Sequence, residues 1–112
     1  MHKIICIILG SLSVGGVPTH VLFDTGATHS VVTPDVVAKF EGNFEKEKVG
    51  VSIATPGSQW LRAESRVIGV PIKIGGRIFR AKLFVMPLNG FDVILEMDWL
   101  GSHRANLDCE KG

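Results

Sequence analysis

The chain has 112 residues, with 12 Lys and Arg against 11 Asp and Glu, and a formal net charge of +1. This length suits a single domain, and 46% hydrophobic with 21% charged residues argues against intrinsic disorder. The near-zero charge gives no electrostatic footprint for nucleic acid, two cysteines cannot form a disulfide-dense scaffold, and no apolar run is long enough to span a bilayer.

The N-terminal segment predicts short strands joined by a glycine turn. Ile4–Leu12 is rich in β-branched residues. A secretory signal is the alternative interpretation, but the apolar stretch Ile4–Leu9 is shorter than the hydrophobic region of such signals. We therefore expect a buried strand and a reducing, cytoplasmic setting. Gly15-Gly16 predicts a hairpin turn, with Val17–Phe23 as the return strand.

A third short strand at Val31-Val32 is followed by a helix. Thr33 is a suitable N-cap, Pro34 suits the first helical position, and an aspartate occupies the first turn. These residues predict a short helix over Asp35–Phe40. The polar stretch Glu41–Lys48 is predicted to be a solvated loop.

Turn residues in the second half predict two further hairpins, whose strands are Val49–Thr55 with Gln59–Ala63 and Arg66–Ile74 with Arg77–Met86. After a loop at Pro87–Gly90, Phe91–Leu95 is predicted to be a strand. Met97–Ser102 is predicted to be a second short helix and Ala105–Asp108 a last strand. The elements together predict a mainly β fold, a closed barrel or a sandwich, with two short helices.

One motif carries chemistry: an apolar strand leads directly into Asp24-Thr25-Gly26. We expect Asp24 where the strand ends and the chain turns, with Gly26 allowing close backbone approach and Thr25 offering a hydroxyl to a partner loop. Two such carboxyl groups about 3 Å apart cannot both ionise, so they share one proton. One then acts as a base toward water and the other as an acid toward a substrate carbonyl. An ordinary β-turn aspartate is the alternative interpretation.

The blocks VLFDTGATHSVV and FDVILEMDWL together resemble the two signature blocks of retropepsin-like aspartic proteases. The similarity is closest to the protease of Ty3/gypsy-type long-terminal-repeat retrotransposon polyproteins and spans nearly the whole chain. It implies one retropepsin-like domain over residues 1–112, a closed β-barrel with two short helices, and neither metal nor organic cofactor. Only Asp24 is followed by Thr-Gly or Ser-Gly. The resemblance therefore implies half a site and a homodimer in which two copies of Asp24 meet.

The resemblance also assigns roles to neighbouring segments. The stretch Ala54-Thr55-Pro56-Gly57-Ser58 corresponds to the flap, a hairpin that closes over an extended peptide. An ordinary surface hairpin is the alternative. Trp60 is expected to pack beneath the flap or in the core. Ala27 lacks the hydroxyl that stabilises the carboxylate in two-lobed cellular relatives, so the pKa of the Asp pair should be higher and the optimum mildly acidic.

Glu96 departs from the family pattern. After Val93, Ile94 and Leu95 the family usually has a glycine, which leaves room for a loop behind the catalytic turn. A glutamate there risks a clash, and if buried it needs a partner or a raised pKa. Alternatively, it faces solvent from the start of a helix.

These features predict an aspartic endopeptidase that is active as a homodimer. The resemblance implies that its substrate is the retroelement polyprotein that contains it, in the cytoplasm or in virus-like particles. The alternative is a catalytically impaired module of the same fold, used for dimerisation or peptide binding. The spacing of the four histidines is unlike that of metal ligands, so no metal site is expected. The basic residues of the strands are expected to form solvated faces, without a nucleic-acid or membrane partner; they are Arg62, Arg66, Lys73, Arg77, Arg80 and Lys82.

Overall fold

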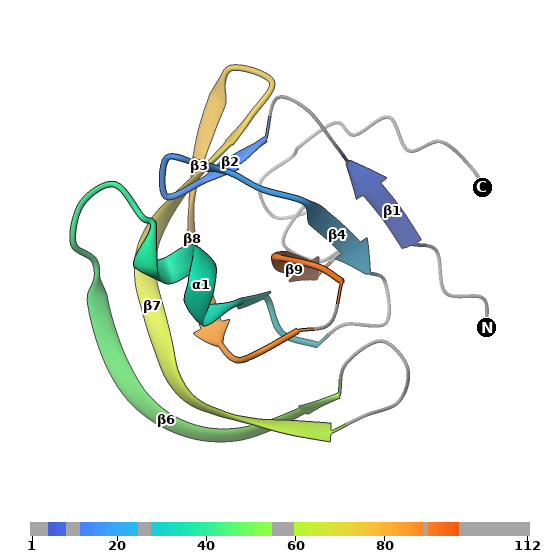
Figure 1. The fold of residues 1–112 in the computed structure, drawn as a ribbon, viewed down its shortest axis with the longest axis vertical. Helices are drawn as coiled ribbons and strands as arrows, with labels where there is room; N and C mark the ends of the chain where they lie inside the picture. Colours follow the sequence, from blue (N-terminus) through green and yellow to red (C-terminus); the bar gives the residue numbers. More distant parts are fainter. Residues whose placement is uncertain (1–4, 9–11, 25–27, 55–59, 89, 97–112) are drawn as a thin grey trace.

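A computed structural model describes residues 5–8, 12–24, 28–54, 60–88 and 90–96. Within them the chain forms one sheet of nine strands and one short helix (Figure 1). The hydrogen-bonded order is β1-β4-β9-β5-β8-β7-β2-β3, and β6 pairs with β7. The bounds are β1 Ile5–Ile8, β2 Ser13–Val14, β3 Val17–Pro18, β4 Val21–Asp24, β5 Val31–Val32, α1 Pro34–Ala38, β6 Glu45–Ala54, β7 Trp60–Ile74, β8 Arg77–Val85 and β9 Val93–Glu96.

The turn between β2 and β3 confirms the first predicted hairpin. Gly15 and Gly16 have φ of +58° and +81°, the left-handed pair that a tight two-residue hairpin turn requires. The predicted return strand is interrupted, however, because β3 pairs with β2 whereas β4 lies between β1 and β9. The chain changes partners at Thr19 and His20. Pro18 precedes this change, and its missing N–H could not extend a ladder.

The mainly β fold is confirmed, but the prediction of a closed barrel is wrong. The terminal strands of the sheet, β1 and β3, do not pair with each other within the described residues. The ladder between β2 and β3 contains two residue pairs, and β3 ends at Pro18, which has no N–H to donate. That edge therefore offers little to a further strand. The predicted second helix, 97–102, and last strand, 105–108, lie outside the described residues.

The prediction of a loop over residues 41–48 is wrong in its second half. Strand β6 begins at Glu45 because residues 45–48 pair antiparallel with residues 65–68 of β7. Strand β7 is a single strand of 15 residues, where the sequence predicted two. Its ladders shift register between Lys48 and Val51 and between Val67 and Val70, and such bulges bend a strand pair. Figure 1 shows β6 and β7 as a long, curved ribbon.

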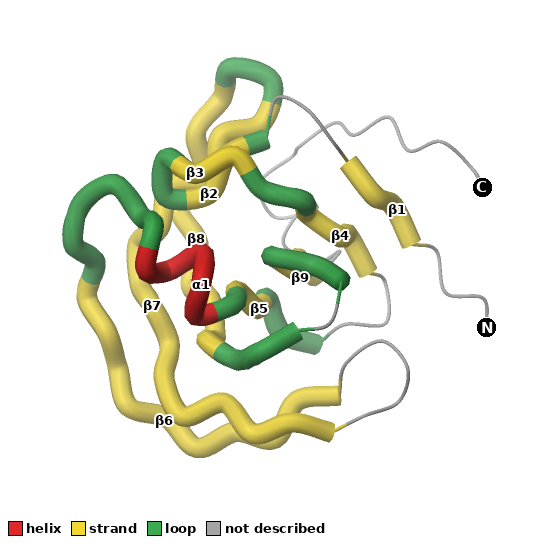
Figure 2. The backbone as a smooth tube through the Cα atoms, in the orientation of Figure 1, coloured by secondary structure: helices red, strands yellow, loops and turns green. Residues whose placement is uncertain are grey.

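Helix α1 begins as predicted. The Thr33 side chain accepts a hydrogen bond from the backbone N–H of Val36 at 3.4 Å, and Pro34 occupies the first turn. The helix ends at Ala38, before the predicted Phe40. Figure 2 shows it on the concave side of β6 and β7, with buried Val36 contributing to the core. No helix among the described residues is long and apolar enough to cross a membrane.

Two groups of buried residues hold the sheet together. A smaller group joins β5 to the parts of β6 and β7 closest to residues 55–59 and contains Val31, Ile53, Ala63 and Met86. The main group contains Leu12, Val14, Val21, Val32, Val36, Val67, Val70, Ile72, Ala81, Leu83, Val93 and Leu95. Because β4 and β9 both contribute to the main group, the core fixes the two strands that lead to Asp24 and Glu96.

Candidate functional site

Asp24 is the last residue of β4, where the strand-to-turn pattern predicted it. Strand β4 lies between two neighbours, antiparallel β1 and parallel β9, and Asp24 has Ile5 and Glu96 as its Cα partners. Val21 and Leu22, earlier in the strand, are fully buried. The backbone of Asp24 is therefore held from both sides at the end of a buried strand. The other predicted loop residues, Thr25, Gly26 and Ala27, lie outside the described residues.

The parallel pair brings the two signature blocks side by side. Val93, Ile94 and Leu95 of β9 are buried, in register with the residues of β4 that precede Asp24. Such continuous burial is typical of a parallel strand covered on both faces. The position of this block behind the Asp-Thr-Gly turn stays a prediction, because residues 25–27 lie outside the described residues. Packing, rather than sequence proximity, thus sets the position of Asp24.

Glu96 occupies the last position of β9, directly beside Asp24 in the ladder. It is half-buried and lies in a strand, so it is neither fully buried nor exposed at the start of a helix, the two extremes that the sequence suggested. Its backbone N–H donates to Ser30 Oγ at 3.3 Å. The strand therefore accommodates a side chain where the family usually has glycine.

Ser30 is a residue that the sequence analysis missed. It is 5% exposed and lies directly before β5. Its Oγ accepts from the Glu96 N–H of β9, and its carbonyl accepts from the Phe84 N–H of β8 at 2.9 Å. Ser30 therefore connects three strands. A buried hydroxyl needs such a partner. The only available signal was a small polar residue directly before the apolar pair Val31-Val32.

A second missed feature is a line of side chains across the sheet. Arg66 was predicted to lie on a solvated face, but the structure pairs it with Glu47. Its Nε donates to Glu47 Oε2 at 3.0 Å, and a second guanidinium nitrogen donates to the same oxygen. The guanidinium carbon lies 5.5 Å from the Phe84 ring centroid. The His29 ring lies 5.0 Å from that centroid, at 87°. Extending the predicted Pro56-Gly57 hairpin outward would have placed Glu47 opposite Arg66.

The predicted flap lies between the ends of β6 and β7. Ala54, exposed, is the last residue of β6 and pairs with Trp60, the first residue of β7. Thr55, Pro56, Gly57 and Ser58 lie outside the described residues. Trp60 is 70% exposed, so the expectation that it packs beneath the flap or in the core is wrong. The two strands that flank this segment, β6 and β7, pair antiparallel, as the strands of a hairpin do.

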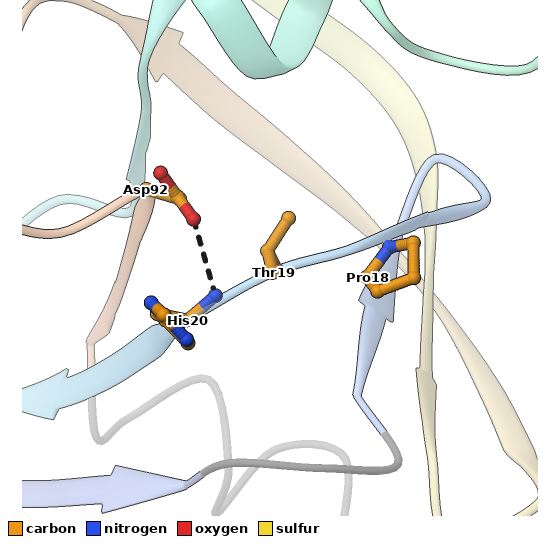
Figure 3. A pocket seen from close by; sticks show the side chains of 4 residues that line it. All are labelled: Pro18, Thr19, His20 and Asp92. Carbon is orange, nitrogen blue, oxygen red and sulfur yellow. Dashed lines mark hydrogen bonds between the residues drawn. The ribbon is translucent and has the colours of Figure 1, made fainter.

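A small pocket of about 190 Å³ lies where β4 and β9 begin, at the opposite ends of these strands from Asp24 and Glu96 (Figure 3). Its lining includes Pro18, Thr19, His20 and Asp92, and the His20 N–H donates to Asp92 Oδ2 at 3.3 Å. Thr19 is 7% exposed, and its hydroxyl has no partner among the described residues. This volume is below the range of typical ligand pockets. The pocket is separate from Asp24, which lies where β4 ends.

Comparison with known proteins identifies similar chains. The family described as Retroviral aspartyl protease matches residues 3–112. The chain is 29% identical over 98 residues to DNA damage-inducible protein 1 of Phaeosphaeria nodorum, which covers 88% of this chain but 22% of that protein. The chain thus spans about a fifth of this curated relative.

Two solved structures are similar over most of the chain. The EIAV protease complexed with the inhibitor HBY-793 has 27% identity and a TM-score of 0.65, over 91% of this chain and 92% of that chain. The retroviral protease-like domain of Ddi1 from Leishmania major has 14% identity and a TM-score of 0.62, over 93% of this chain and 81% of that chain. The second similarity concerns the fold alone.

Proposed function

Because the chain belongs to the retroviral aspartyl protease family, we propose that it is an aspartic endopeptidase that hydrolyses extended polypeptide segments. The observation that carries the proposal is the position of Asp24 at the end of β4, a strand held on both sides by β1 and β9. General acid–base catalysis requires a carboxyl group in a defined position, and a backbone fixed in this way supports that requirement.

The reaction requires two carboxyl groups, and the sequence contains one Asp-Thr-Gly. The proposed active species is therefore a homodimer in which each subunit contributes Asp24. The ionised carboxylate accepts a proton from water as the water oxygen attacks the peptide carbonyl carbon. The protonated carboxyl donates its proton to the carbonyl oxygen, which gives a tetrahedral intermediate. Collapse of this intermediate breaks the C–N bond, and a proton passes to the leaving amine.

The proposed substrate is the polyprotein of a retroelement, in the cytoplasm or in virus-like particles, as the sequence blocks suggest. The similarity to DNA damage-inducible protein 1 supports a competing setting, a protease-like domain inside a longer protein. An assay can distinguish the two settings. It compares the cleavage of junction peptides from a retroelement polyprotein that contains this chain with the cleavage of unrelated unfolded proteins. A clear preference for the junctions favours the retroelement.

The test of the proposed chemistry compares the wild type with Asp24→Asn on an unfolded protein substrate, with and without a statine-type inhibitor. We expect the inhibitor to block hydrolysis and the substitution to lower its rate by at least about 100-fold, the usual contribution of a catalytic acid or base. Equal rates for the wild type and Asp24→Asn would contradict the proposal.

Mixing the two proteins tests the shared site. With equal amounts of wild type and Asp24→Asn, free exchange of subunits leaves about half of the wild-type chains paired with an inactive partner, so activity should fall to about half that of the wild type alone. A monomeric enzyme would keep its full activity in the mixture.

Glu96 favours a second candidate function, a catalytically impaired module for dimerisation or peptide binding. Its position in the ladder beside Asp24 puts a second acidic residue next to each proposed catalytic aspartate. Glu96→Gly removes both size and charge, whereas Glu96→Gln removes the charge alone. A rise in activity of about tenfold or more in either variant would support impairment by Glu96. An active wild type that neither substitution improves would exclude this candidate.

A further inference from the structure

We propose that a line of side chains across the sheet positions the backbone of Asp24 by acting through Ser30. We name this line the cross-sheet row, and it consists of Glu47, Arg66, Phe84 and His29. The inference rests on the proposed function, in which Asp24 is the reacting group. The members of the row are positioning residues, because the described contacts connect them to Asp24 through Ser30 and the end of β9.

The first step is the ladder that aligns the row. Glu47 is the Cα partner of Arg66, and Arg66 is the Cα partner of Phe84, so the three side chains stand next to one another on adjacent strands. Arg66 grips Glu47 through two nitrogens, with side-chain exposures of 27% and 39%, and its guanidinium lies over the Phe84 ring. A partly desolvated cation over an aromatic face fixes the orientation of the ring.

The second step leads from Phe84 to the segment that follows the Asp-Thr-Gly turn. The Phe84 and His29 rings meet edge to face, the arrangement that aromatic pairs prefer. The next residue, Ser30, accepts a hydrogen bond from the Phe84 N–H at 2.9 Å. Thr28 Oγ1 lies 2.7 Å from His29 Nδ1 and restrains the imidazole from the other direction. Phe84 therefore holds this segment by both its ring and its main chain.

The third step leads from Ser30 to Asp24. Ser30 is buried, and its Oγ accepts from the Glu96 N–H at 3.3 Å. Glu96 is the Cα partner of Asp24. A displacement of Ser30 therefore reaches the end of β9 at the level of Asp24. Misplacement of a reacting group by about 1 Å can lower the rate of an enzyme by up to about 100-fold.

A second cation–aromatic pair in the same hairpin provides a matched control. The guanidinium carbon of Arg77 lies 5.6 Å from the Phe79 ring centroid, nearly the distance found between Arg66 and Phe84. Arg66 and Phe84 lie on β7 and β8, whereas Arg77 and Phe79 both lie on β8. Phe79 pairs with Ile72 of β7, and Phe84 pairs with both β7 and β5. The control keeps the chemistry of the contact and changes its place in the sheet.

The experiment measures Arg66→Met, Phe84→Leu and Arg77→Met in two ways. Hydrogen exchange of the Glu96 amide, followed by NMR, reports the bond to Ser30. The kcat and KM per active site, titrated with a statine-type inhibitor, report the reaction. We expect Arg66→Met and Phe84→Leu to accelerate exchange of the Glu96 amide about fivefold and to lower kcat about fivefold, with KM little changed, because a positioning effect acts on the reacting geometry. Arg77→Met should change neither quantity.

Two milder variants keep the test valid if a substitution unfolds the protein. Phe84→Tyr retains the ring and should retain the wild-type exchange rate and kcat. Arg66→Lys retains the charge but loses the two-nitrogen grip on Glu47, and should lie between the wild type and Arg66→Met.

The outcomes separate the two proposals. An unchanged Glu96 exchange rate in Arg66→Met and Phe84→Leu overturns the positioning role, whether or not the protein cleaves substrate. A kcat per titrated site equal to that of the wild type also overturns it, because the row would then contribute only to folding. If the wild type and Asp24→Asn hydrolyse substrate equally, the proposed function fails, and the exchange rate of the Glu96 amide still decides whether the row holds the end of β9.

Discussion

The short pair of strands β4 and β9 and the long pair β6 and β7 follow different rules in the same sheet. Strands β4 and β9 have 4 residues each, run parallel, and are buried at every described side chain before Asp24 and Glu96. Strands β6 and β7 have 10 and 15 residues, run antiparallel, and expose or half-expose most of their side chains. Burial specifies the first pair, whereas cross-strand contacts and bulges specify the second.

This difference bears on function. The proposed catalytic residue lies at the end of the short, buried pair, where the core leaves little freedom. The long pair carries the predicted flap segment and the polar contacts that shape the sheet. We therefore expect small changes in the buried region formed by β4, β5, β9 and their connections to lower the free energy of unfolding. Changes at exposed positions of the outer hairpins should leave it nearly unchanged.

The largest expected effect comes from Leu95→Ala in β9. Leu95 is fully buried, and removing its side chain should lower the free energy of unfolding by about 2–5 kcal/mol, through lost burial and the cavity that remains. Ile78→Ala in β8 is the matched control, because Ile78 is 62% exposed and should change it by less than about 0.5 kcal/mol. Urea unfolding of both variants measures the difference. Similar losses of unfolding free energy in the two variants would contradict the difference between the buried and the exposed regions.

The next effect is a gain in stability from Thr19→Val, two residues before β4. The Thr19 hydroxyl is buried without a partner among the described residues, which costs free energy in the folded state. Valine has a similar shape and should raise the free energy of unfolding by about 1–2 kcal/mol. A loss of stability in thermal unfolding would show that this hydroxyl is satisfied in solution.

A smaller loss is expected for Thr33→Ala, directly after β5. The Thr33 side chain caps α1 by accepting from the Val36 N–H, but the bond is long at 3.4 Å. The free energy of unfolding should fall by about 0.5–1 kcal/mol, the lower half of the usual range for an N-cap. Thr33→Ser retains the cap and should restore most of the loss in the same denaturation assay.

The smallest effect is expected for Arg62→Gln in the outer hairpin. Arg62 pairs with Glu64 at 2.9 Å, but the two side chains are 60% and 73% exposed. Solvent screening limits such a pair, so the free energy of unfolding should change by less than about 0.5 kcal/mol. A loss above 1 kcal/mol would mean that the outer hairpin is as sensitive as the buried region.

Local chemistry explains what the sequence could predict. The Gly15-Gly16 turn, the Thr33 cap and the position of Asp24 each depend on a few adjacent residues, and each was predicted. A strand was predicted over Phe91–Leu95, and the structure has it at Val93–Glu96. The proposed catalytic role of Asp24 stays a prediction that depends on the resemblance of two sequence blocks.

Long-range pairing explains what the sequence could not predict. Residues 45–48 alternate in charge and resemble a solvated loop, and only their pairing with β7 makes them a strand. The bond between Ser30 and Glu96 joins residues that are 66 positions apart. Trp60 was expected beneath the flap or in the core, but its burial depends on surroundings that a local pattern does not contain.

The one-sided pairing of β6 has a consequence for behaviour at high concentration. Within the described residues β6 pairs only with β7, so its other edge presents unpaired amides and carbonyls that could template the addition of strands from other molecules. The first part of that edge consists of Glu45, Lys46, Glu47 and Lys48. A foreign strand docking there would have to strip water from full charges of both signs. The charged residues 45–48, which made the start of this strand resemble a loop, should therefore oppose aggregation of the protein.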